Sequence, residues 1–292
     1  MEYPMGTLFT GRRSLESLVG VCVHELMHSW YQMVLGFNES LYPWMDEGFT
    51  SYASVRVMNH LNTIKALPGE PKEFPFDGEN NSYIKLAKQG LEEPLSTHAD
   101  HFEFNTAYNQ SAYTKGSVFL NQLEYVIGKP AFDKGLLNFF NTWKFKHPDV
   151  HDFIRVMEKA SGLELDWYKE YMVYTTKTID YAIDTVYENA SNTNIILGRI
   201  GLMPMPVDVT VILQDGDVIS YTIPLDIMRG AKVEKLNEAG SFQILPDWNW
   251  VNPYYGVTVP YPLEKIESIT IDASKRMADM DRENNEWPIT KS

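Results

Sequence analysis

The chain lacks several features that would narrow its class. It has 292 residues but only one cysteine, Cys22, so no internal disulfide bond can form. No apolar run approaches the ~20 residues that a bilayer-spanning helix needs. The opening residues, MEYPMGTLFTGRR, have no basic start followed by an apolar stretch, so the sequence predicts no signal peptide here. These absences leave the compartment unknown.

Basic residues are also in short supply. The chain has 25 lysines and arginines against 39 acidic residues, a net charge of −14. Binding to nucleic acid needs clustered basic side chains, so we expect no nucleic-acid partner. Hydrophobic residues make up 44% and charged residues 22%, the profile of a globular protein long enough for two domains.

The first 177 residues read as mostly helical. A helix is expected after Ser14, a candidate N-cap, with Gly36 as a candidate stop. The stretch 67–81 is rich in Pro, Gly and acids and is predicted to be a loop. Further helices are predicted at 48–61, 112–127, 130–144, 151–161 and 167–174.

Strand signals replace helical ones near Thr178. TIDYAIDTVYE alternates in hydrophobicity, and a turn is expected at 189–194. VDVTVILQDGDVISYTIPL predicts two strands joined at Asp215-Gly216, and IESITIDAS predicts another. Short strands with turn signals predict an antiparallel sandwich. The predicted architecture is therefore multidomain α+β, with a helical domain at 1–177 and a β-sandwich domain at 178–292.

Two histidines lie four residues apart in GVCVHELMHSW. At about 100° per residue on a helix, His24 and His28 fall within about 40° of each other. They lie opposite the apolar stripe of the same helix, which predicts that they line a cleft while the stripe faces the core. The members of the stripe are Leu15, Leu18, Val19, Cys22 and Leu26.

Imidazoles at this spacing can share one zinc ion, and a catalytic zinc takes a third protein ligand. Glu47 follows His28 after eighteen residues, enough to end one helix and start an antiparallel one. Glu25 lies beside the histidines and is placed to act as a general base toward a zinc-activated water that attacks a carbonyl. The alternative is a surface helix with an incidental histidine pair.

HELMH, eighteen residues and then DEG resemble the zinc site of the gluzincins. MEYPMGTL resembles the Met-Glu segment, and SAYTKG the Tyr-x-Lys-Gly motif, of the M1 zinc aminopeptidases, a family that includes aminopeptidase N and leukotriene A4 hydrolase. Tyr3 stands where that family has Asn. The resemblance covers essentially the whole chain, and it is most specific over the first 120 residues.

This resemblance implies several roles. It implies that Glu2 holds the free α-amino group of the substrate and that Tyr113 stabilises the oxyanion, with Lys115 and Gly116 expected to be structural. It implies a thermolysin-like helical subdomain followed by an immunoglobulin- or fibronectin-like sandwich. It also implies that the chain is the C-terminal half of a longer peptidase that has an N-terminal β-domain.

The predicted function is that of a zinc aminopeptidase with a peptide substrate. Its metal ligands are His24, His28 and Glu47, its base is Glu25, and Tyr113 and Glu2 complete the site. Two alternatives remain: a non-catalytic or weakly active fragment of such a peptidase, and an epoxide hydrolase using the same site. A second pair, His98 and His101, is expected to lie in a solvated loop rather than to bind a metal.

Overall fold

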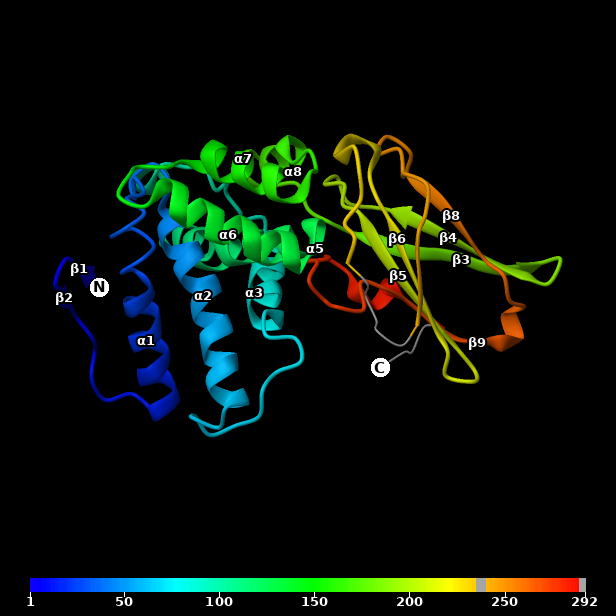
Figure 1. Ribbon diagram of the computed structural model, residues 1–292, viewed down its shortest axis with the longest axis horizontal. Helices are drawn as coiled ribbons and strands as arrows, with labels where there is room; N and C mark the ends of the chain where they lie inside the picture. Colours follow the sequence, from blue (N-terminus) through cyan, green and yellow to red (C-terminus); the bar gives the residue numbers. More distant parts are fainter. Residues whose placement is uncertain (235–239, 289–292) are drawn as a thin grey trace.

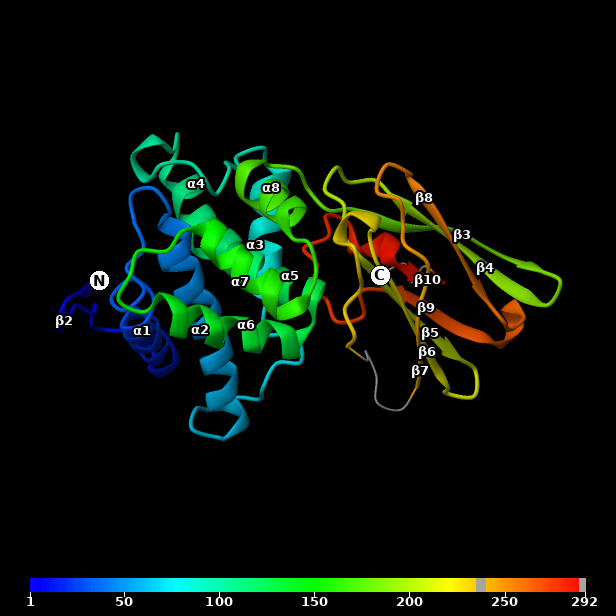
Figure 2. The same ribbon diagram turned by 45° about the horizontal axis from the view of Figure 1, so that its top comes forward.

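The computed structural model describes residues 1–234 and 240–288. A helical part and a strand-rich part lie side by side along the long axis (Figure 1), and the second view keeps them apart (Figure 2). The last long helix ends at Tyr174 and the first strand of the strand-rich part starts at Tyr181. Over the described residues, no helix is both long and apolar enough to cross a membrane.

The helices follow the predicted ranges closely after residue 100. Two short strands, β1 (Glu2–Tyr3) and β2 (Gly6–Thr7), precede them. A π-helix at Gln110–Lys115 leads directly into α5. The α-helices are α1 (Leu15–Met27), α2 (Pro43–Thr63), α3 (Asp77–Lys88), α4 (Asn105–Asn109), α5 (Gly116–Ile127), α6 (Lys129–Trp143), α7 (Val150–Ser161) and α8 (Asp166–Tyr174).

Several predicted boundaries are wrong, including the start of the helix predicted at 48–61, which is Pro43. Ser14 does cap α1 by accepting from the backbone N–H of Ser17 at 3.3 Å, but the helix ends at Met27 rather than near Gly36. Helix α3 begins inside the predicted loop, at Asp77. Acidic residues in its first turn favour the helix N-terminus, and its buried Tyr83 and Leu86 supply packing that the loop-like composition concealed.

The apolar stripe of α1 does not face the core as predicted. None of the residues of α1 is buried, and Leu15 and Leu26 are 60% and 57% exposed. The histidine side of the helix packs against α2 instead, and His28 is 1% exposed. Within the described residues, Leu18 is also exposed and Val19 and Cys22 are only partly buried, so the side of α1 that meets the core is the one with the functional side chains.

The strand-rich part holds two sheets. One has five strands in the order β10-β9-β5-β6-β7, and the other has three in the order β3-β4-β8. The strands are β3 (Tyr181–Asn189), β4 (Asn192–Arg199), β5 (Val207–Leu213), β6 (Val218–Ile223), β7 (Ser241–Ile244), β8 (Tyr254–Val259), β9 (Ile266–Ile271) and β10 (Glu286–Trp287).

The hairpin predicted at Asp215-Gly216 is confirmed, the turn predicted at 189–194 is shorter because β4 begins at Asn192, and the sheets are not wholly antiparallel. Strands β5 and β6 pair around Gly216, which has a φ of 89°, and β3 and β4 join through Ala190 and Ser191, both at positive φ. Strands β6 and β7 pair in parallel. The connection between them, residues 224–240, is long enough for the crossover that parallel neighbours require.

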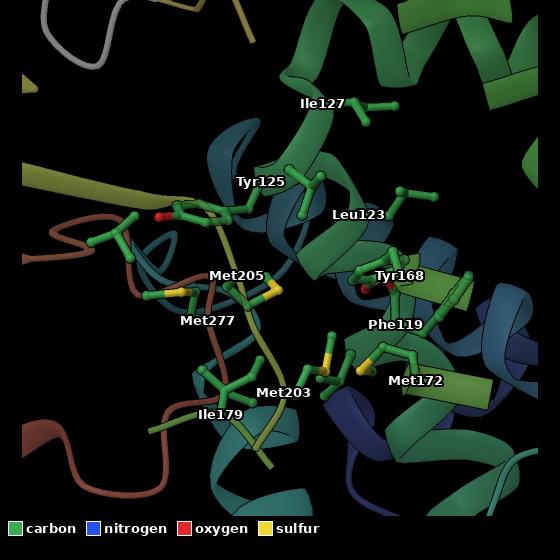
Figure 3. Close-up of a cluster of buried hydrophobic side chains, with 14 of the residues drawn as sticks. Phe119, Leu123, Tyr125, Ile127, Tyr168, Met172, Ile179, Met203, Met205 and Met277 are labelled. Atoms are coloured by element: carbon green, nitrogen blue, oxygen red, sulfur yellow. Dashed lines mark hydrogen bonds between the residues drawn. The ribbon is translucent and has the colours of Figure 1, made fainter. Parts of the chain in front are cut away.

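Helix α5 forms the junction between the two parts. Phe119, Leu123 and Tyr125 lie among Tyr168 and Met172 of α8 and sulfur-bearing side chains from the strand-rich part (Figure 3). Eleven of its twelve residues are buried, which is unusual for a helix of a globular domain. Both parts therefore share one continuous core around α5.

Helices α2 and α5 cross at two glycines. A Cβ added to Gly48 would lie 2.6 Å from the Cα of Gly116, and one added to Gly116 would lie 2.8 Å from the Cα of Gly48. Those contacts are with backbone atoms, so no side-chain rotation could relieve them. Because Glu47 precedes Gly48 and Tyr113 lies just before Gly116, this crossing sets how closely two candidate site residues approach.

We expect Gly116→Ala to lower the free energy of unfolding by about 1–3 kcal/mol, because overpacking forces the two helices apart. Denaturant unfolding measures this change. Gly78→Ala in α3 is the matched control, since an added Cβ there meets nothing within 4 Å. Alanine favours a helix by about 1 kcal/mol over glycine, so the control should be neutral or stabilising. Equal stability of the two variants would contradict the tight crossing.

Candidate metal centre

Three nitrogen and oxygen atoms converge where the end of α1 meets the start of α2. Nε2 of His24 lies 3.1 Å from Oε2 of Glu47, and Nε2 of His28 lies 3.3 Å from the same oxygen. The two imidazole nitrogens are themselves 3.3 Å apart. His24 lies in the last turn of α1, His28 is its C-cap, and Glu47 is the fifth residue of α2.

These three donor atoms fit a zinc ion. A tetrahedral ion with ligands at about 2.0–2.1 Å sets neighbouring ligand atoms about 3.3 Å apart. All three separations lie close to that value. Two imidazoles and one carboxylate are also a common ligand set of catalytic zinc sites, which leave a fourth position open.

His28 is held from its other side by a second acidic residue. Its Nδ1 donates to Oδ1 of Asp46 at 2.7 Å, and both side chains are buried. Burial alone would lower the pKa of His28, but hydrogen bonds to Asp46 and Glu47 and their charges outweigh it and raise the pKa to about 10. A metal must therefore displace a proton from His28, while Asp46 fixes the ring so that Nε2 faces the donor cluster.

Glu47 is held in its charged form. Burial alone would raise its pKa, but hydrogen bonds from His24, His28 and Tyr113 lower the pKa to about 2. The hydroxyl of Tyr113 donates to Oε1 of Glu47 at 2.5 Å, and its ring stacks on His24 with centroids 5.7 Å apart. Burial and the Glu47 charge raise the pKa of Tyr113, so its hydroxyl remains a donor.

A cavity of about 400 Å³ adjoins the donor cluster between α1 and the β1–β2 hairpin. Glu2, Glu25 and His28 line it, and they each offer an atom within 4.8 Å of the others. Two carboxylates are thus close enough together to face a single cationic group.

The family profile described as the Peptidase family M1 domain matches residues 8–172 of this chain. The chain belongs to peptidase family M1. The matched region includes both histidines, Glu25, Glu47 and Tyr113, whereas Glu2 precedes it. The M1 resemblance predicted from the sequence motifs is therefore confirmed.

Known relatives are much longer than this chain. It is similar to a leukotriene A-4 hydrolase homolog of Botryotinia fuckeliana, 31% identical over 46% of this chain and 21% of that protein. It is also similar to leucine aminopeptidase 2 of Sclerotinia sclerotiorum, 30% identical over 46% of this chain and 22% of that protein. The chain thus spans about a fifth of the length of these M1 relatives.

Among solved structures, the fold is similar to that of Legionella pneumophila aminopeptidase A in complex with aspartic acid. The match has a TM-score of 0.56 and covers 90% of this chain and 26% of that one. Sequence identity is 15%, so this comparison speaks for the fold alone. Its coverage shows that the likeness extends over both the helical and the strand-rich parts.

The structure brings together the six side chains that the sequence assigns to this M1 site, namely Glu2, His24, Glu25, His28, Glu47 and Tyr113. His98 and His101 lie elsewhere, at a short 3-10 helix where His98 accepts from the backbone of Asp100. Among the described residues, that pair joins no group of three potential metal ligands. Sequence reasoning missed Glu39, which clusters with Glu2 and Asp46 and carries no motif that could reveal it.

We expect Asp46→Asn to weaken zinc binding by about 10–100-fold, the usual cost of losing a carboxylate that orients a metal-bound histidine. Competition with a chelator measures the affinity. Glu39→Gln is the control, because it removes one negative charge from the same acidic cluster without touching His28. If both variants lose affinity equally, general electrostatic attraction explains the effect and the orienting role is wrong.

Proposed function

We propose that this M1 chain carries the site of a zinc aminopeptidase, which removes single residues from the N-termini of peptides. The observation that carries the proposal is the spacing of three donor atoms, 3.1–3.3 Å apart, beside a cavity lined by two carboxylates. The three donor atoms can bind a metal ion, and the two carboxylates can bind a free amine and transfer a proton.

His24, His28 and Glu47 would hold the zinc ion. When bound, zinc supplies Lewis-acid chemistry by polarising a carbonyl group and lowering the pKa of water. The charged form of Glu47 favours this role, as does the orientation that Asp46 gives to His28. Two neutral imidazoles and one carboxylate would leave the ion with a net positive charge, which suits electrophilic activation.

Glu25 would act as the general base. Its side chain is 11% exposed and borders the cavity, one residue after His24, so it lies beside the metal ligands without being one of the donor triad. From there its carboxylate accepts a proton from the attacking water and returns it to the leaving amine. Partial burial strengthens this exchange, because water competes less for the carboxylate.

Glu2 would fix the substrate by its free α-amino group. Its carboxylate lies beside Glu25 in the same cavity, where two negative charges favour an ammonium group. An anchored amine places the first peptide bond, and no later one, over the metal. Tyr113 would donate its hydroxyl to the developing oxyanion, from a position already next to Glu47.

We also propose a domain identity for each of the two parts of the chain. Residues 1–177 would be the helical portion of a thermolysin-like catalytic domain, and residues 178–292 a β-sandwich, of which 235–239 and 289–292 lie outside the described residues. The epoxide-hydrolase alternative gains no separate support, because the paired carboxylates of Glu2 and Glu25 suit an amine.

We expect Glu25→Gln to lower kcat for aminoacyl anilides by about 10²–10⁴-fold, the usual contribution of a general base. Zinc content should stay at one ion per chain, because Glu25 holds no metal in this scheme. Elemental analysis of both proteins separates these effects. An unchanged rate would show that Glu25 is not the base, and lost zinc would show that it is a ligand.

We expect Glu2→Gln to raise KM for aminoacyl anilides, because it weakens the bond to the amine in both ground and transition states. N-acetylated anilides, which lack the cation, should not be cleaved by either protein. If the wild-type chain cleaved the acetylated anilide as fast as the anilide with a free amine, the exopeptidase proposal would be wrong. A wild-type chain that binds one zinc and cleaves neither substrate would instead support the inactive-fragment alternative.

A further inference from the structure

Tyr113 sits on an unusual backbone segment. Residues 110–115 form a π-helix between α4 and α5, and Tyr113 is the fourth of its six residues. Such wide turns are rare and are frequently found at functional sites. A π-helical turn contains one more residue than an α-helical turn. Side chains that precede it are therefore rotated by about 100° about the helix axis, relative to their positions in a regular α-helix. The direction of the Tyr113 hydroxyl therefore depends on this register.

A buried ion pair ends this π-helix. Nζ of Lys115 lies 2.6 Å from Oε1 of Glu92, with side-chain exposures of only 1% and 4%. The same ammonium donates to the backbone carbonyl of Thr175 at 3.3 Å, and Tyr83 donates to Oε1 of Glu92 at 3.2 Å. Glu92 and Thr175 thus hold the end of Lys115, and Tyr83 holds Glu92 in place.

Stability alone explains this pair poorly. Taking two charges out of water costs about as much as their attraction returns, so apolar replacements are often neutral or stabilising. What such a pair does supply is a defined position for its side chains. Lys115 is two residues from Tyr113 and directly precedes Gly116, whose backbone is pressed against Gly48. The π-helix is therefore anchored immediately after the tyrosine.

We propose that Lys115 is a positioning residue, whose ion pair with Glu92 holds the π-helical register that aims the Tyr113 hydroxyl at Glu47. Without the pair, the segment can relax to the more stable α-helical hydrogen bonding, which turns Tyr113 away from the donor cluster. The kinetic consequence rests on the proposed aminopeptidase function, but the register itself does not.

The test compares two buried pairs of equal exposure. Lys115→Met with Glu92→Gln neutralises the first and keeps an acceptor for Tyr83. Lys232→Met with Asp208→Asn neutralises the second, whose side chains are likewise 1% and 4% exposed. Lys232 donates to the carbonyl of Tyr125, roughly 18 Å along the helical segment from Tyr113, so this control perturbs the same helix far from the site.

For the full chain, the first pair variant should lower kcat for aminoacyl anilides with little change in KM. Its loss should not exceed that of Tyr113→Phe, about 10²–10³-fold for one oxyanion donor. Adding Tyr113→Phe to the pair variant should cost nothing further, because both changes remove one interaction. The control pair should keep its kcat per folded molecule. Additive losses, an equal loss in the control or an unchanged kcat would overturn the proposal.

A second measurement needs no turnover. In protein labelled with ¹³C at the hydroxyl-bearing ring carbon of tyrosine, the Tyr113 resonance is assigned by its loss in Tyr113→Phe. It should shift in the Lys115→Met, Glu92→Gln variant and stay in place in the control. An unmoved resonance would refute the positioning role even in an active enzyme. A moved resonance in a chain without peptidase activity would support it while the proposed function fails.

Discussion

The closest backbone approach between α2 and α5, at Gly48 and Gly116, is the constraint on which the candidate site depends. Glu47 directly precedes Gly48 in α2, and Tyr113 lies on the π-helix that leads into Gly116. A side chain at the crossing would force the helices apart and lengthen the 2.5 Å hydrogen bond between Tyr113 and Glu47. Two residues without side chains thus decide whether the tyrosine reaches the carboxylate.

Repulsion among clustered carboxylates is the second constraint on the candidate site. Asp46 and Glu47 both bond His28, and Glu2, Glu25 and Glu39 lie close by. So many carboxylates repel one another unless positive charge lies among them, so the site favours a divalent cation and an ammonium group. The charge that stabilises a bound metal is therefore also the charge that would select a substrate by its amine.

The sequence predicted the features that depend on residues close together along the chain. The i, i+4 histidines and the Asp215-Gly216 hairpin depend on neighbouring residues, and both appeared where expected. The π-helix around Tyr113 and the Lys115–Glu92 pair depend on contacts between distant segments, and no spacing rule reveals them. The prediction that the apolar stripe of α1 faces the core was wrong for a different reason. Hydrophobic periodicity identifies a helix face that favours burial, but burial also requires another part of the protein to pack against that face.

The strand-rich part holds the C-terminal half of α5. Near the end of this helix, the hydroxyl of Tyr125 donates to the carbonyl of Pro206 and accepts from the N–H of Asp208. Gln122 accepts from the backbone of Ala278 at 2.8 Å. A buried helix held this way cannot slide or rotate freely, because each bond lost would leave a buried polar group unpaired. The strand-rich part thereby fixes the C-terminal half of α5, while the Gly48–Gly116 crossing and the Lys115–Glu92 pair fix its other end, where the π-helix presents Tyr113.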